Sequence, residues 1–511
     1  MRLFQSQNRI NALGQENPST LSYTKVYQER FVTPIDNSFI HYTSDFASSV
    51  SNLSAVTGAS PSISGGNLVV SDTTLMKSTT TAGKSWMCCE MTISSMSTTG
   101  ASQKLGPAIV KDSSNYICGL YDSVGQTVSI IENGTQRAAA NYTLNTTNCK
   151  LWIILTRFSI SFWGQPSGGA LKLLLLYDTS IAYDGLTTMD TYYYGVRSVQ
   201  STAANHNVSS LRGGLPGTFG TLNTRVVVDE NGAPYYRSGK LILTADLVAP
   251  TTNSAGYNAA NSALLEMDVD TYELNIIGRY FFKRNSKILG GQDIKIQYRA
   301  DEAKWMMTYA RVDDILNGFE NDVYILMTEA EMLDETVFED TRYNAFGIAD
   351  ANAYDYSSRL IGGTWYVLAA DGWGERAIAK LYTGSSLSSL TLADSYDDGV
   401  RFFELTSFAR FNDTWYYLYT GFDYLKVAVL SHPNMDFVGN IDYPTFVANS
   451  RIGGSDWWVK QSGGVSEYYL ICFDNQTAVF TDATGNQIPF TNAVGNHAIW
   501  KATETRTGLE F

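Results

Sequence analysis

The sequence contains 511 residues, of which 44% are hydrophobic and 17% are charged, and its formal net charge is −14. A chain of this length is expected to form two or three domains, and its apolar content excludes global disorder. It has no Lys- or Arg-rich run with interleaved aromatic residues, so nucleic acid is not an expected partner. The 32 Tyr, 23 Phe, 10 Trp and 42 Gly favour strands and turns over helices. We therefore predict an all-β protein.

The first 29 residues are polar and weakly periodic, so the sequence predicts an extended N-terminal arm outside any core. Such an arm either joins a protein to a larger assembly or is a flexible terminus with no partner, and both interpretations stay open. The opening stretch has no apolar core of about 7 to 15 residues, so we expect no ordinary signal peptide. The sequence also has no run of about 18 apolar residues, so we expect no membrane insertion.

Residues 30–212 alternate short strand-like runs with turns rich in Ser, Thr, Gly and Asn. Strands of this length and spacing predict an antiparallel β-sandwich. The order of the runs IENGT, SISFWGQPSGG, LKLLLLYD and YYYGVRS resembles a concanavalin-like or laminin-G-like jelly roll. The Gly-rich segment SSLRGGLPGTFGTL, residues 209–222, predicts a linker and a domain boundary near residue 215.

The five cysteines show no spacing typical of a zinc site or a redox pair. The odd number favours buried free thiols, although a bridge between Cys118 and Cys149 stays open for an extracellular protein. Four histidines are scattered through the chain, and we predict neither a metal site nor a cofactor.

Residues 213–511 contain an internal repeat. Five segments share a strand, a polar turn and an aromatic or aliphatic strand, and their second strands are predicted to begin near Leu241, Trp305, Trp365, Trp415 and Trp457. The intervals between these starts are 64, 60, 50 and 42 residues. Strand-rich repeats of about 40 to 60 residues are typical of propeller blades. We therefore predict a five-bladed β-propeller, with a second, unrelated sandwich as the alternative.

Three carboxylates occupy informative places in the first, second and fourth repeats. Asp229 lies just ahead of the strand YYRSGKLIL, Asp293 opens IKIQYRADEAKWMMTYA, and Glu404 stands eleven residues before Trp415. This pattern resembles the five-bladed propeller glycoside hydrolases, the superfamily of arabinanases, xylosidases and fructosidases. The resemblance implies that Asp229 is the base or nucleophile, that Asp293 orients the acid and raises its pKa, and that Glu404 is the general acid.

The sequence departs from that family's motifs at two of these positions. Leu405-Thr406 replaces the Gly-Pro that follows the acid, and Gly291-Gln292 replaces the Ala-Pro that precedes the second-blade Asp. Asp229 also opens Asp-Glu-Asn-Gly, a good hairpin turn that needs no catalytic purpose. Whether the three carboxylates are catalytic therefore stays open.

Aromatic residues in the repeats are candidates for stacking on sugar rings. We single out Trp373, which has glycine on both sides, Tyr424 in GFDYLK, and Trp457 in the fifth repeat. Aromatic residues at strand starts in propellers also pack between blades, so packing is the alternative for each.

These features predict a protein that recognises a glycan or polysaccharide through both domains. The N-terminal arm and the expected lack of a signal peptide favour a phage virion component, such as a tail fibre, that binds the host surface, or else an extracellular location. An active glycoside hydrolase is the first alternative and a purely structural virion protein the second. Other virion proteins are expected partners of the arm, and a homo-oligomer stays open.

Overall fold

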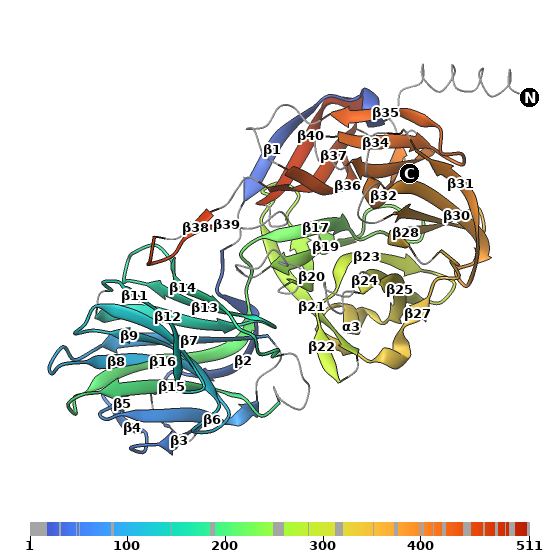
Figure 1. Ribbon diagram of the computed structural model, residues 1–511. Coiled ribbons are helices and arrows are strands. Elements are labelled where there is room, and N and C mark those ends of the chain that lie inside the picture. The colour runs from blue at the N-terminus through green and yellow to red at the C-terminus, as the bar shows by residue number, and fades with distance from the viewer. Residues whose placement is uncertain are drawn as a thin grey trace, which may run out of the picture.

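Among the residues that the computed structural model describes, the chain is almost entirely β-structure in two parts that lie side by side (Figure 1). The described residues are 18–29, 32–47, 49–50, 52–82, 86–144, 146–183, 190–248, 260–284, 286–311, 320–350, 352–372, 377–397, 399, 403–411, 413–421, 426–442, 451–462, 465–475, 479–485, 487–489 and 496–507. Three short helical segments interrupt the strands: η1 (Pro18–Thr20), α3 (Glu329–Met332) and η3 (Asp340–Arg342).

The first part consists of two antiparallel sheets. The seven-stranded sheet has the order β11 (Thr135–Asn141), β10 (Thr127–Glu132), β9 (Tyr116–Asp122), β8 (Gln103–Val110), β15 (Tyr193–Gln200), β6 (Thr74–Ala82) and β3 (Leu53–Thr57). The eight-stranded sheet has the order β14 (Lys172–Asp178), β13 (Ser159–Gln165), β12 (Thr147–Leu155), β7 (Met87–Ser95), β16 (His206–Pro216), β5 (Asn67–Val70) and β4 (Ser62–Ser64), and β2 (Ile35–Ser44) pairs with β16.

One apolar core joins the facing sides of these two sheets. Alternate residues of each strand contribute to it, for example Met91 and Leu151 from one sheet and Leu105 and Ile117 from the other. A Cβ atom at Gly119 would lie 2.1 Å from the Phe162 ring, so the sheets approach too closely there for any larger residue. The core is therefore that of two sheets packed face to face, a β-sandwich.

The predicted linker at residues 209–222 is wrong, because most of it is strand. β16 runs without interruption to Pro216, and β17 begins at Thr221. The glycines serve close packing: a Cβ atom at Gly213 would lie 2.2 Å from the Tyr194 ring, and one at Gly214 would lie 2.4 Å from the carbonyl oxygen of Phe39. Glycine composition alone does not distinguish a flexible joint from a crowded strand.

The second part consists of sheets in a propeller-like arrangement. The first, seven-stranded sheet contains β17 (Thr221–Val226), β19 (Lys240–Val248), β20 (Ala260–Met267), β21 (Leu274–Arg284) and β22 (Lys287–Leu289), with β18 (Tyr236–Arg237) and β26 (Glu335–Phe338) at its sides. The next sheets are β23 (Gln292–Arg299), β24 (Lys304–Arg311), β25 (Glu320–Met327), β27 (Asn344–Ala345); then β28 (Ala353–Ile361), β29 (Thr364–Asp371), β30 (Ile378–Ser386), β31 (Ser389–Tyr396); then β32 (Phe403–Phe411), β33 (Thr414–Gly421), β34 (Lys426–Ser431), β35 (Phe437–Asp442). The last is β1 (Tyr23–Glu29), β40 (Asn496–Thr507), β37 (Val465–Asn475), β36 (Arg451–Ser462).

The predicted starts of the second strands agree with the structure in four of the repeats. β19, β24, β29 and β33 each begin one residue ahead of the aromatic or aliphatic residue that marked the repeat. In the fifth repeat the prediction is wrong, because Trp457 lies within β36, which is the first strand of its sheet. The aromatic pair Trp457-Trp458 imitates the second-strand signature of the other repeats.

The N-terminal arm is also a wrong prediction for the residues that the structure describes. β1 pairs antiparallel with β40 as the edge strand of the last sheet, and Leu21 and Tyr23 are buried in a core shared with Trp457 and Trp500. The two ends of the chain therefore build one sheet (Figure 1). Alternate apolar residues in LSYTKVY give this strand its buried face. Residues 1–17 lie outside the described part of the chain.

The two parts share a packed interface. Arg279 of β21 donates from Nη1 to Asp36 Oδ2 of β2 over 2.8 Å, and both side chains are fully buried or nearly so. The Trp163 and Phe219 rings stack with their centroids 4.5 Å apart. The β38–β39 hairpin (Val479–Thr481 and Gln487–Pro489) adds a second link, since Ala483 N donates to the carbonyl of Leu174 in the sandwich.

Candidate functional site

The first strands of the five large sheets in the second part carry the same irregularity. β17 lies beside β23 and β36, and β32 lies beside β28 and β36, so these first strands lie next to one another on the inner side of the propeller-like arrangement, whose middle we call the axis. Each shows a register shift against the second strand of its sheet, and the shifts fall at Leu222/Arg225, Gln292/Lys295, Tyr354/Ser357, Glu404/Ser407 and Gly453/Asp456. A β-bulge of this kind redirects the side chains that follow it.

Four residues in these bulges have a left-handed backbone conformation without being glycine. They are Asn223, Asp293, Asp355 and Leu405, with φ of 49°, 47°, 56° and 52°. Asn and Asp tolerate this conformation, whereas a branched side chain such as that of Leu405 is strained there. Strained residues of this kind are concentrated at functional sites, which makes the bulges the natural place to look for one.

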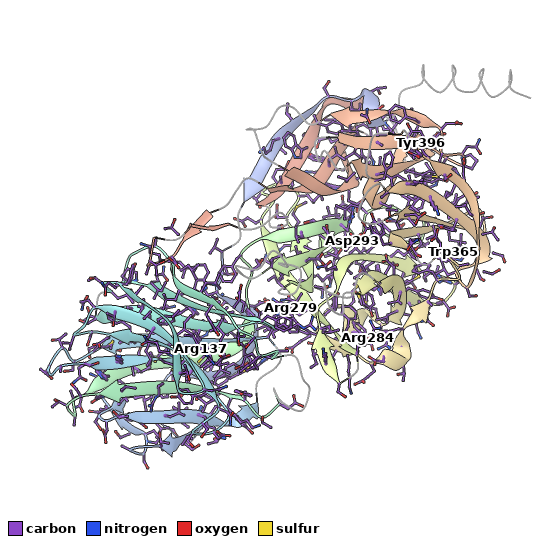
Figure 2. All side chains as sticks on the ribbon, viewed as in Figure 1. Arg137, Arg279, Arg284, Asp293, Trp365 and Tyr396 are labelled. Carbon is purple, nitrogen blue, oxygen red and sulfur yellow. The ribbon has the colours of Figure 1, made fainter. Side chains whose placement is uncertain are left out.

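Polar side chains from the bulged first strands, together with one each from β19 and β25, form a cluster at the axis. We call it the axial cluster, and it consists of Arg225, Asp246, Asp293, Lys295, Asp322, Asp355, Ser357, Ser407 and Asp456. Asp355 and Lys295 are partly exposed, whereas Arg225 is only 1% exposed and Asp293 only 3%. Asp293 therefore lies in the interior of the ring (Figure 2).

Asp293 is held by two cations. Arg225 Nε donates to Asp293 Oδ1 over 2.8 Å, and Lys295 Nζ donates to Asp293 Oδ2. Burial alone would raise the pKa of Asp293, but the positive charges of Arg225 and Lys295 outweigh it and hold the pKa below its usual value. Asp293 is thus kept ionised in the middle of the ring.

The other carboxylates of the axial cluster tie neighbouring sheets together. Asp246 Oδ2 accepts from the backbone N of Asp293, and Asp322 Oδ2 accepts from Tyr356 N. Asp355 Oδ2 accepts from Leu405 N at 3.0 Å. Asp456 Oδ2 accepts from Val226 N at 2.7 Å, which joins the last sheet to the first. Asp293, Tyr356 and Leu405 lie inside the register shifts of their strands, so these bonds satisfy backbone donors that the bulges remove from their own ladders.

Burial gives three of these carboxylates unusual proton affinities. It raises the pKa of Asp246 to about 8 and that of Asp322 to about 7. Burial and the negative charge of Asp293 raise the pKa of Asp355 to about 6, although Lys295 works in the opposite direction. Asp293 and Asp355 occupy equivalent bulge positions in consecutive sheets, but the pKa of Asp293 is lowered and that of Asp355 is raised.

The structure places the three predicted catalytic residues differently. Asp293 lies in the axial cluster. Asp229 follows β17 in a turn, where its Oδ1 accepts from the backbone N of both Asn231 and Ala233 at 2.8 Å, so it has the turn-forming role that the sequence left open. Glu404 begins the bulge of β32, and its side chain lies outside the described part of the structure.

Of the three predicted sugar-stacking residues, the structure describes Trp457. Trp457 is 6% exposed and packs against Tyr23, Phe411 and Tyr468, and its Nε1 donates to the carbonyl of Arg410, so the stacking prediction is wrong for this residue. Trp373 and Tyr424 lie outside the described residues, and their roles stay predictions.

Most of the axial cluster was missed from the sequence. The signal was present: Asp293 stands twelve residues ahead of Trp305, and Asp355 and Leu405 each stand ten residues ahead of Trp365 and Trp415. When the repeats are aligned on their aromatic strands, the residues ten to twelve positions earlier include Asp355 as well as Asp293. The family motif matches Glu404 instead, which lies one residue before Leu405, the equivalent bulge position.

The described residues contain no group of three or more His, Cys, Asp or Glu side chains placed to hold a metal ion. Among the same residues, no helix is long and apolar enough to cross a membrane.

No protein-family model and no curated protein matches the chain. Among solved structures it is similar to an N-acetylgalactosamine deacetylase from F. plautii, with 12% identity and a TM-score of 0.38 over 57% of this chain and 91% of that one. It is similar to a GH43_1 enzyme from Xanthomonas citri, with 13% identity and a TM-score of 0.36 over 55% and 86%. It is also similar to the carbohydrate-binding module CBM66 from Bacillus subtilis, with 15% identity and a TM-score of 0.25 over 32% and 95%.

Proposed function

We propose that this protein recognises carbohydrate at the bulge end of the axial cluster. The observation that carries the proposal is the convergence of Asp, Ser, Lys and Arg side chains, most of them from the bulged first strands, at the axis. Sugars are neutral and rich in hydroxyl groups, and carboxylates, amides and ammonium groups bind them through directional hydrogen bonds.

The charge of the axial cluster suits a neutral ligand. Arg225 and Lys295 compensate the ionised Asp293. The raised pKa values of Asp246 and Asp322 leave a large share of these carboxyls protonated near neutral pH. Partly exposed Asp355 and Lys295 are the groups best placed to meet a ligand that approaches along the axis.

A second candidate function is glycoside hydrolysis. It is favoured by the separation in proton affinity between Asp293 and Asp355, because cleavage of a glycosidic bond needs one carboxylic acid and one carboxylate. In this hydrolytic mechanism Asp355 donates the proton to the leaving oxygen and Asp293 remains ionised. Glu404 is the further carboxylate that the resemblance suggests. Hydrolysis would then decline as the pH rises above about 6, where Asp355 loses its proton.

The finer fold prediction also stays a proposal. We propose a five-bladed ring, formed by the sheets that begin with β17, β23, β28, β32 and β36, and its support is the bulge that recurs in all five first strands. A jelly-roll topology for the sandwich is proposed on its two facing sheets. A virion setting loses one of its arguments, because part of the expected arm is a strand of the last sheet.

The test uses a panel of arabinan, xylan, fructan and bacterial surface polysaccharides. Binding is measured by calorimetry and hydrolysis by release of reducing ends, for the natural chain and for Asp355→Asn. We expect binding to at least one polysaccharide, weakened at least about tenfold by the substitution, which corresponds to about 1.4 kcal/mol. If the site is hydrolytic, Asp355→Asn lowers the rate about 100-fold or more.

Asp413→Asn is the matched control. Asp413 lies in the turn at the opposite end of β32 and β33, its side chain is 66% exposed, and it also has a left-handed backbone that Asn tolerates. We expect this variant to bind like the natural chain. Binding to no member of the panel, or equal losses in both variants, would contradict the proposal.

A further inference from the structure

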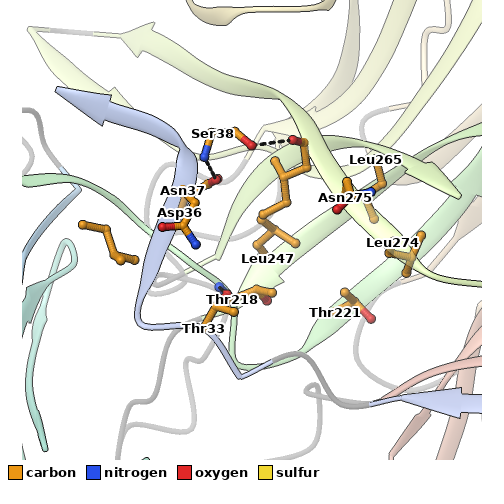
Figure 3. A pocket seen from close by; sticks show the side chains of 12 residues that line it. Thr33, Asp36, Asn37, Ser38, Thr218, Thr221, Leu247, Leu265, Leu274 and Asn275 are labelled. Carbon is orange, nitrogen blue, oxygen red and sulfur yellow. Dashed lines mark hydrogen bonds between the residues drawn. The ribbon is translucent and has the colours of Figure 1, made fainter. Parts of the chain in front are cut away.

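A cavity of about 150 Å³ lies between the sandwich and the ring of sheets (Figure 3). One side is formed by the chain around β2 and the other by β17, β19, β20 and β21. The buried interface that joins the two parts, including the Asp36–Arg279 ion pair, forms its edge. None of the residues that line the cavity belongs to the axial cluster.

The cavity has a buried floor and an exposed rim. Ile35, Asp36, Leu247 and Leu265 are buried, whereas Thr33, Asn37, Ser38 and Asn275 are exposed. A ligand can therefore enter from solvent and reach the floor without separating the two parts. A site with this shape differs from a sealed packing defect, which has no exposed rim.

The polar side of the cavity has no net charge to offer. Asp36 Oδ2 accepts from Arg279 Nη1 at 2.8 Å and Asp36 Oδ1 accepts from Ser38 N at 3.0 Å. The carboxylate is already compensated by Arg279, so a charged ligand gains little from the ion pair as a whole. Carboxylate oxygens have further lone pairs, which accept hydrogen bonds from hydroxyl groups.

A buried hydroxyl group on the cavity wall lacks a partner. Thr221 is 1% exposed, and its Oγ1 makes no hydrogen bond within the described part of the chain. An unsatisfied buried hydroxyl destabilises a protein by about 1 to 3 kcal/mol, so such a group in a native structure calls for an explanation. A ligand hydroxyl in the cavity would supply the missing bond.

The opposite side of the cavity is apolar. Leu247, Leu265, Leu274 and Ile276 line it. A surface that pairs hydroxyl, amide and carboxylate groups with aliphatic side chains matches a molecule with a polar edge and a C–H face. We propose that this cavity binds a small neutral polyol through its vicinal hydroxyl groups, with Asp36 as acceptor and Thr221 as the buried contact.

The volume limits the enclosed part of the ligand. A cavity of about 150 Å³ encloses a molecule the size of benzene, with six non-hydrogen atoms. Glycerol, with six non-hydrogen atoms, fits whole, whereas erythritol, with eight, or a terminal sugar unit would insert one diol edge and leave the rest at the rim. Both sources share the same chemistry, and the experiment separates them.

The experiment measures saturation-transfer NMR and calorimetric binding of glycerol, erythritol and the methyl glycosides of xylose, arabinose and galactose. We expect saturable binding of at least one, weakened at least about fivefold by Thr221→Val and abolished by Leu274→Phe, which fills the cavity. Preference for glycerol or erythritol would identify a free polyol, and preference for a glycoside a terminal sugar. Both variants must retain the thermal unfolding midpoint of the natural chain to within a few degrees.

The control for the site is Asp293→Asn, which alters the axial cluster and is expected to leave this binding unchanged. Loss of binding in Asp293→Asn but not in Thr221→Val would assign the signal to the axis and overturn the cavity proposal. A lack of saturable binding by every probe would show that the cavity holds only water, which also overturns it. The second result does not depend on whether the axial cluster binds polysaccharide.

Discussion

The sandwich and the ring of sheets bury their charges in different ways. In the sandwich, Glu132 is 1% exposed, but its ionic partner Arg137 is 34% exposed and reaches it from the surface. In the ring, Arg225 and Asp293 are 1% and 3% exposed, and further carboxylates surround them. In this pair of the sandwich one charge is buried and its partner reaches it from the surface, whereas the ring concentrates several buried charges of both signs around its axis.

The difference indicates what each arrangement is for. Glu132 accepts hydrogen bonds from Thr179 and Tyr183, so its burial fastens one segment of chain. The buried charges of the ring carry a larger desolvation penalty, because several ions are removed from water. Apolar residues of similar size often stabilise a protein equally well or better. Their convergence is therefore better explained by a ligand or a reaction at the axis than by stability.

The largest effect that separates the two parts is expected from deleting residues 1–29. The deletion removes β1 from the edge of the last sheet and the side chains of Leu21 and Tyr23 from its core. The expected loss is about 5 kcal/mol, from two large buried side chains and the hydrogen bonds of one strand. Hydrogen-exchange mass spectrometry checks it: β36, β37 and β40 should lose protection while β7 and β12 keep theirs. Unchanged protection in β40 would show that β1 is dispensable.

The next largest effect should come from breaking the central ion pair. Arg225→Met leaves the buried carboxylate of Asp293 with only Lys295, and the expected loss is about 3 to 5 kcal/mol in urea unfolding. Arg137→Met is the matched change in the sandwich, and it should lose less, because Arg137 is partly solvated and Glu132 keeps its hydrogen bonds from Thr179 and Tyr183. Similar losses in both variants would remove the distinction between the two parts.

The sequence predicted the strands of both parts well, because alternation and repeat spacing are local signals. The starts of β19, β24, β29 and β33 follow from their aromatic or aliphatic residues. What it could not show is pairing between distant segments. β1 and β40 lie at opposite ends of the chain, and neither contains a motif for the other, so a strand was interpreted as an arm.

The axial cluster was only partly predictable for a related reason. Asp293 was found because it opens an inner strand, but its partner Arg225 lies 68 residues earlier and is identified only by the ring that brings their strands together. Asp229 was chosen by position along the chain, and its turn satisfies it locally. Bulge geometry, which decides the direction of each side chain, depends on backbone pairing that composition does not reveal.

The two parts should respond to pH with opposite signs. In the ring, burial raises the pKa of Asp246 from 3.8 to about 8, so the folded state retains a proton that the unfolded chain releases, and stability falls as the pH rises from about 4 to about 8. In the sandwich, burial lowers the pKa of His206 from 6.5 to about 4, so the unfolded chain binds the extra proton, and stability falls as the pH drops from about 6.5 to about 4.

Two isosteric or near-isosteric variants isolate these contributions. Asp246→Asn keeps an acceptor for Asn223 and for the backbone N of Asp293, and it should gain stability relative to the natural chain as the pH rises from 5 to 8. His206→Asn keeps an acceptor for Ser97 N and should gain relative stability as the pH falls from 7 to 4. Each pKa unit is worth at most about 1.4 kcal/mol. Urea unfolding across this range gives both slopes, and parallel slopes would refute the assignment of the two groups.

The smallest expected difference concerns single hydroxyl groups. Ser357 Oγ donates to the carbonyl of Thr406 over 2.6 Å and links two neighbouring sheets of the ring, whereas Thr179 Oγ1 donates to Glu132 over the same distance in the sandwich. A bond to a neutral carbonyl contributes about 1 kcal/mol and one to a carboxylate about 1.5 to 3 kcal/mol. We therefore expect Thr179→Val to destabilise the protein more than Ser357→Ala in urea unfolding. The reverse order would mean that Ser357 is coupled to the charges of the axial cluster, because the loss of an isolated neutral hydrogen bond cannot exceed that of a charged one.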